Sequence, residues 1–133
     1  MTKLREAVAA TVLAAALWTA GAPTAGAGIE DYEFQLVEDA VRQGEALIAA
    51  RLVDRRSGRA VPDAVIFARR IDMAPDGMPA MTAPLEAAAA AEPGVYRFRT
   101  NLAMAGNWRL SLATKVQGET GTLESRLNLR AVP

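Results

Sequence analysis

The chain has 133 residues and a mass of 14.1 kDa, which is enough for one domain and too little for two of ordinary size. Its 15 basic and 15 acidic residues balance, so no net charge draws the chain to nucleic acid or to an anionic membrane. The sequence contains neither Cys nor His, which excludes disulfides, thiolate zinc sites, Cys nucleophiles and His general bases. We expect no enzymatic activity and assign no catalytic residue, because the serine and threonine hydroxyls have no histidine to activate them.

Residues 1–27 have the pattern of a signal peptide. Lys3 and Arg5 form a short basic segment, and an uncharged, largely apolar run of 14 residues follows. The segment Ala25-Gly26-Ala27 then offers the small residues that a signal peptidase requires. Because a bilayer takes about 20 apolar residues to span, we expect cleavage at this point rather than a retained anchor. The remaining domain, residues 28–133, is expected to be periplasmic or secreted, with no membrane contact after cleavage.

Strand patterns begin soon after this segment. Tyr32–Val37 alternates between two faces, which predicts a half-buried strand. Residues 46–53 are apolar on both faces except for Arg51, which is typical of a central strand covered on both sides. A charged turn follows at 54–59, where Gly58 can adopt a positive φ.

The middle of the chain combines a strand with an irregular segment. Alternation from Val65 to Ile71 predicts a strand with Phe67 in the core. Residues 72–84 hold three prolines and a glycine, which predicts a loop without regular structure. A further strand is expected at 95–100, where aromatic residues alternate with arginines.

The clearest alternation begins at Trp108 and continues to Gln117, and a last strand follows from Leu123 to Arg130. The chain therefore contains six to seven short strands and no convincing amphipathic helix. This pattern predicts an all-β fold, an immunoglobulin-like antiparallel β-sandwich in which two sheets bury their apolar faces against each other. Trp108 is expected to be one of its core residues.

Three segments resemble one known family. They are GRAVPDAVIFARRIDMAPDGMPAMTAP from Gly58, GVYRF from Gly94 and MAGNWRLSLATKVQGE from Met104. In order and spacing they are similar to the FixH-like or YtkA-like family of small exported domains. Some members of that family accompany heavy-metal efflux systems of the resistance-nodulation-division type, and others the copper supply of haem-copper oxidases. The resemblance implies an immunoglobulin-like sandwich and a link to copper or silver handling, with an efflux adaptor or a copper-assembly protein as partner.

Methionine is the residue type that suggests a binding chemistry. Met73, Met78 and Met81 fall within nine residues, and Met104 lies in the turn before Trp108. Thioether sulfur is a soft ligand that suits Cu(I) or Ag(I) and binds Zn(II), Mg(II) or Ca(II) poorly. The four methionines are therefore the candidate ligands of a soft monovalent ion, and no organic cofactor is expected.

Two other interpretations of these methionines stay open. Met73 continues a strand face and is favoured as a core residue, and Met104 can fill one end of the sandwich. Alternatively, the domain is a metal-free interaction module, and its Met-rich loop docks on an efflux adaptor or an oxidase assembly factor. The sequence alone does not separate the metal site from the docking module, since both favour exposed methionine.

Overall fold

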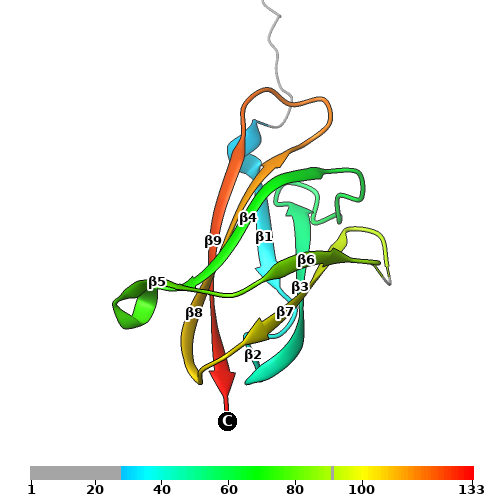
Figure 1. Ribbon diagram of the computed structural model, residues 1–133. Coiled ribbons are helices and arrows are strands. Elements are labelled where there is room, and N and C mark those ends of the chain that lie inside the picture. Colours follow the sequence, from blue (N-terminus) through cyan, green and yellow to red (C-terminus); the bar gives the residue numbers. More distant parts are fainter. Residues whose placement is uncertain (1–27, 91) are drawn as a thin grey trace, which may run out of the picture.

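The computed structural model describes residues 28–90 and 92–133, which form two packed β-sheets (Figure 1). The first sheet has the strand order β1-β3-β7-β6 and contains β1 (Tyr32–Leu36), β3 (Gly44–Asp54), β7 (Val95–Leu102) and β6 (Leu85–Ala88). The second has the order β2-β9-β8-β4-β5 and contains β2 (Ala40–Arg42), β9 (Leu123–Val132), β8 (Gly106–Lys115), β4 (Val65–Met73) and β5 (Met78–Thr82). Two short 3-10 turns, η2 (Ile29–Asp31) and η3 (Ala74–Asp76), are added to the strands. The prediction of an all-β, immunoglobulin-like sandwich is confirmed, with more strands than the six to seven expected.

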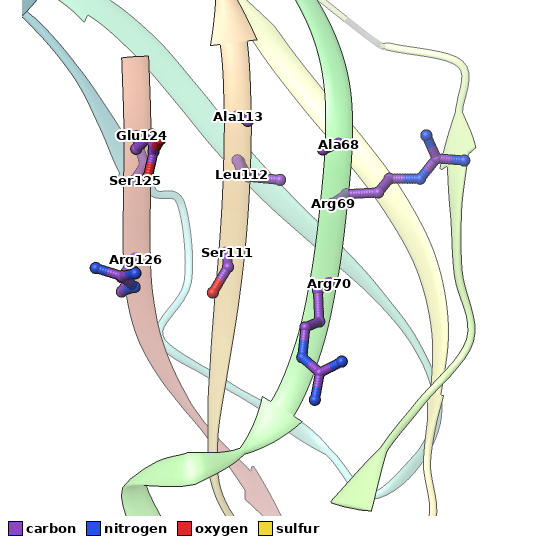
Figure 2. A pocket seen from close by; sticks show the side chains of 9 residues that line it. All are labelled: Ala68, Arg69, Arg70, Ser111, Leu112, Ala113, Glu124, Ser125 and Arg126. Carbon is purple, nitrogen blue, oxygen red and sulfur yellow. The ribbon is translucent and has the colours of Figure 1, made fainter. Parts of the chain in front are cut away.

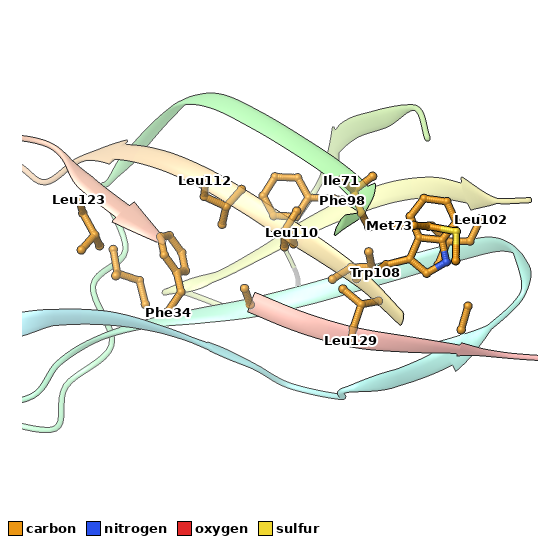
Figure 3. Close-up of a cluster of buried hydrophobic side chains, with 14 of the residues drawn as sticks. Phe34, Ile71, Met73, Phe98, Leu102, Trp108, Leu110, Leu112, Leu123 and Leu129 are labelled. Carbon is orange, nitrogen blue, oxygen red and sulfur yellow. The ribbon is translucent and has the colours of Figure 1, made fainter. Parts of the chain in front are cut away.

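The core lies between the inner faces of the two sheets (Figure 3). Trp108 is fully buried, as its place in the alternating strand β8 predicted. From the facing sheet, Phe34 and Phe98 enter the same cluster. The strongest sequence pattern of the chain therefore identifies a strand that supplies three members of this cluster, Trp108, Leu110 and Leu112. The remaining buried apolar members of the cluster are Ile48, Ala50, Leu52, Ile71, Met73, Leu102, Leu110, Leu112, Val116, Leu123, Leu129 and Ala131.

A β-bulge in β4 overturns the prediction for Phe67. Ile66 pairs with Thr114 and Ala68 pairs with Ala113, so two steps along β4 correspond to one step along β8. The extra residue is Phe67, and beyond it the inward and outward positions of the strand are exchanged. Phe67 is consequently 54% exposed, whereas Ile71 is buried.

The outer face of β3 was also predicted wrongly. This strand is central in its sheet, between β1 and β7, but its outer face is largely open to solvent. Leu47 is 44% exposed and Arg51 is exposed, while Ile48 and Leu52 lie in the core. In a sandwich of two layers each sheet has a solvated outer face. Apolar residues at outward positions therefore do not imply that a further layer of the protein covers that face.

Residues 72–84 are more regular than their composition predicted. They contain the end of β4, the η3 turn and the edge strand β5, which pairs with β4 at Asp72↔Thr82 and Met73↔Met78. Pro79 is tolerated because β5 is an edge strand, where a missing N–H leaves no ladder partner unsatisfied.

Strand β2 also has no counterpart in the sequence pattern. After β1 the chain crosses from the first sheet to the second, where β2 pairs in parallel with β9 and forms the edge of that sheet.

Within the residues described, no helix has the length and apolar character needed to cross a membrane. The predicted signal peptide, residues 1–27, lies outside the described residues.

Candidate functional site

One end of the sandwich is organised by a contact between η3 and the start of β8. The Asp76 carboxylate accepts a hydrogen bond from the main-chain N–H of Asn107 at 2.8 Å and a second from Nδ2 of the same residue at 3.0 Å. These two bonds fix the connection between β4 and β5 against the turn that precedes β8. They also hold the pKa of Asp76 below its usual range.

Gly106 allows this contact to be close. Its φ is 140°, a conformation that side-chain-bearing residues rarely adopt. A Cβ at this position would lie 2.6 Å from Oδ2 of Asp76 and 2.7 Å from Cε of Met73. The absence of a side chain therefore lets the η3 carboxylate and the Met73 methyl group reach the backbone of β8.

The segments that carry Met73, Met78 and Met104 meet at this end. Met78 is the register partner of Met73 across β4 and β5. Met104 lies in the turn that Asp76 fixes, and its carbonyl oxygen accepts a hydrogen bond from Nε1 of Trp108 at 3.1 Å. The structure therefore brings the 72–84 segment and the turn before Trp108 to the same end of the sandwich.

The exposure of the methionines differs. Met78 is 37% and Met104 is 38% exposed, so both residues lie partly open to solvent. Met73 is buried and belongs to the same core cluster as Trp108 (Figure 3). Met81 is half-buried and packs against the core. The pairing of β5 with β4 shifts register between Asp72 and Met73, so simple two-residue alternation does not hold between Met78 and Met81.

The charges near this end are already compensated. Asp72 is buried, which raises its pKa, but a hydrogen bond from Nε of Arg70 at 2.8 Å, another from the N–H of Ala74 at 2.9 Å and the nearby charge of Arg109 outweigh this effect. The net result is a pKa of Asp72 below its usual value. In the described part of the chain, no three acidic groups lie together in a way that could hold a metal ion.

The sequence pattern did not reveal the two residues that assemble the site. Asp76 stands in a Pro-Asp-Gly sequence that is common in turns, and Asn107 follows a glycine, so each alone indicates only a turn. Their partnership spans 31 residues and becomes visible only in the fold.

A different hollow, of about 180 Å³, lies across β4, β8 and β9. Figure 2 shows Arg70, Ser111 and Arg126 coming from these three neighbouring strands. Arg70 is already engaged, since it donates to Asp72 and to the carbonyl oxygen of Pro79. No methionine lines this hollow, so it is separate from the methionine end.

Comparison with known proteins identifies a family. A family model described as YtkA-like matches residues 26–113. Among solved structures, the crystal structure of the Lin-41 filamin domain is 20% identical, with a TM-score of 0.42, and the match covers 74% of this chain and 93% of that domain. The ZirS C-terminal domain is 10% identical, with a TM-score of 0.44, and the match covers 91% of this chain and 88% of that one. No curated protein matches the chain.

Proposed function

The chain belongs to the YtkA-like family, and on this premise we propose that it is a periplasmic accessory domain of copper or silver handling or efflux. It binds Cu(I) or Ag(I) through methionine thioethers and acts beside an efflux adaptor or a copper-assembly protein. The domain has no catalytic role. The family supports the accessory role, and the methionine end supports the choice of ion.

The observation that carries this proposal is the fixed position of two exposed methionines. Met78 and Met104 lie on segments that Asp76 holds together through its two hydrogen bonds to Asn107. A site whose ligand-bearing segments are already ordered loses less entropy when it binds. Met73, which is buried, is the third candidate ligand.

Thioether chemistry sets the selectivity of such a site. A soft, neutral sulfur favours Cu(I) and Ag(I), while Zn(II) prefers thiolate, nitrogen or oxygen donors and Cu(II) prefers nitrogen and oxygen donors. A thioether also has no proton to lose on binding, so affinity changes little with pH, unlike that of Cys or His sites.

Competition for Cu(I) against a chromophoric chelator tests the proposal. We expect the double variant Met78→Leu/Met104→Leu to bind at least about tenfold more weakly than the wild type, a difference of about 1.4 kcal/mol. Since Leu and Met have similar volume, each replacement should change stability by less than about 1.5 kcal/mol.

Met81→Leu is the matched control, because this methionine is half-buried and packs against the core. Its affinity for Cu(I) should equal that of the wild type. Equal affinity of the wild type and the double variant would contradict the proposal and favour the metal-free interaction module.

A further inference from the structure

Most of β4 is an open sheet edge. On one side β4 pairs with β8, but on the other side β5 pairs with it only at Asp72 and Met73. Among the residues that the structure describes, no strand pairs with Val65–Arg70 on this side. The main-chain groups on that side of the segment are therefore available to an added strand, over a length of about 20 Å at 3.3 Å per residue.

A groove of about 190 Å³ adjoins this edge. It lies between β4 of one sheet and β6 and β7 of the other, and Ile66, Tyr96, Phe98 and Ala87 are among its lining residues. Strand β6 is the edge of its own sheet, so the groove lies along the side of the sandwich where both sheets have edges. Alternate side chains of an added strand would point into it.

Two hydrogen-bonded contacts keep the groove in shape. The Tyr96 hydroxyl donates to the carbonyl oxygen of Val61 at 2.7 Å and accepts from the N–H of Ala64 at 3.0 Å, which fixes the start of β4 to β7. Farther along β4, Nε of Arg69 donates to the carbonyl oxygen of Leu85 at 3.0 Å, which ties β4 to β6. Binding therefore requires little ordering of the protein.

The surroundings of the edge define the chemistry of its partner. Val65 is 57% and Phe67 is 54% exposed, so the edge offers apolar contacts outside the groove as well. Among the described residues, the charged side chains that line the groove are Arg69 and Arg97, and none of the lining residues is acidic. This combination complements an extended segment in which apolar and acidic residues alternate.

We propose that the Val65–Arg70 edge of β4 binds an extended acidic segment of a partner protein as an additional strand, with its apolar side chains in the groove beside β6. A second copy of this chain is a poorer occupant. Pairing of two such edges would place Arg69 and Arg70 of one copy close to Arg69 and Arg70 of the other, and these like charges repel. The groove contains none of the four candidate metal ligands, so this inference goes beyond the proposed function and does not depend on it.

The test uses the purified chain and a blocked peptide of alternating glutamate and valine as the probe. We expect titration to shift the amide resonances of residues 65–70 and to slow their hydrogen exchange. The same peptide with lysine in place of glutamate should bind at least about tenfold more weakly. A glutamate peptide that leaves these amides unchanged at about 1 mM, or a lysine peptide of equal affinity, would overturn the proposal.

A pair of alanine variants provides a second test. Ala87→Glu places a charge in the groove on the exposed edge strand β6, whereas Ala40→Glu makes the same change on the distant edge strand β2. We expect at least about tenfold weaker binding for the first and wild-type binding for the second. Equal binding by both variants would contradict the proposal. Self-association that protects residues 65–70 without peptide would also contradict it, because a second copy would then occupy the edge.

Discussion

The carboxylate of Asp76 binds both the main chain and the side chain of Asn107, at 2.8 and 3.0 Å. The Asp76 carboxylate thereby holds the connection between β4 and β5 against the first residues of β8. The two segments contribute Met78 and Met104, so the spacing of the methionines depends on this pair of residues rather than on the methionines themselves.

Replacing Asp76 with alanine should therefore loosen the methionine end and leave the rest of the sandwich intact. The amide of Asn107 loses its acceptor, so we expect its hydrogen exchange to become at least about tenfold faster. Cu(I) affinity should fall in parallel, because the two methionine segments are no longer held together. Asp39→Ala, a change at an exposed aspartate before β2, is the control and should alter neither quantity. Unchanged exchange at Asn107 in the Asp76 variant would contradict the role given to this contact.

The two aromatic residues that the sequence placed in the core should now behave differently. Trp108 is fully buried, so Trp108→Ala should cost about 3–5 kcal/mol of unfolding free energy. Phe67 is 54% exposed, so Phe67→Ala should cost less than about 1 kcal/mol. Urea denaturation of both variants measures the difference. A similar loss in the two would mean that the bulge in β4 is misplaced.

Acid should weaken the fold through Asp72. Folding lowers the pKa of this carboxyl group, so its contribution is complete above the unfolded pKa of about 4 and is lost as the pH falls through the folded value. We expect Asp72→Asn to be less stable by about 1–3 kcal/mol at neutral pH and to depend less on pH below about 4. Thermal denaturation between pH 2 and 7 checks this. Parallel pH profiles for the wild type and the variant would argue against the assignment.

Alkali should weaken the fold through Tyr32. Its hydroxyl donates to the Glu119 carboxylate at 2.8 Å, and this hydrogen bond, with burial and the charge of Glu119, raises the pKa of Tyr32 to about 12. A group whose pKa rises on folding stabilises the fold below its unfolded pKa, here about 10, and this stability is lost as the pH rises toward 12. Tyr32→Phe should lose less stability across this range than the wild type. An ultraviolet titration that shows Tyr32 ionising near pH 10 would refute the prediction.

Where one face of a strand is covered and the alternation is unbroken, the sequence was sufficient to predict the structure. Trp108 and the residues that alternate with it in β8 follow the two-residue period throughout, and their burial agrees with it. Phe67 shows the limit of this reasoning. A bulge depends on how β4 pairs with β8, and the alternation within β4 carries no sign of the partner strand.

The candidate site was predictable only in part. The four methionines are visible as a residue type, and the burial of Met73 agrees with the face that it continues. The difference in exposure between Met78 and Met81 was not visible, because prolines and a glycine hid the edge strand that carries them. The ligand role of each methionine remains a prediction.

The parallel pairing of β2 with β9 gives the sandwich a mechanical property. Three residue pairs form this ladder, Ala40↔Arg130, Val41↔Ala131 and Arg42↔Val132. Main-chain bonds flank it, from Arg130 to Asp39 at 2.8 Å and from Gln43 to Val132 at 2.7 Å. Tension applied before β2 and after β9 pulls the two parallel strands along their length in opposite directions. The bonds are then loaded together in shear, whereas an antiparallel hairpin pulled at its open end would lose them one at a time.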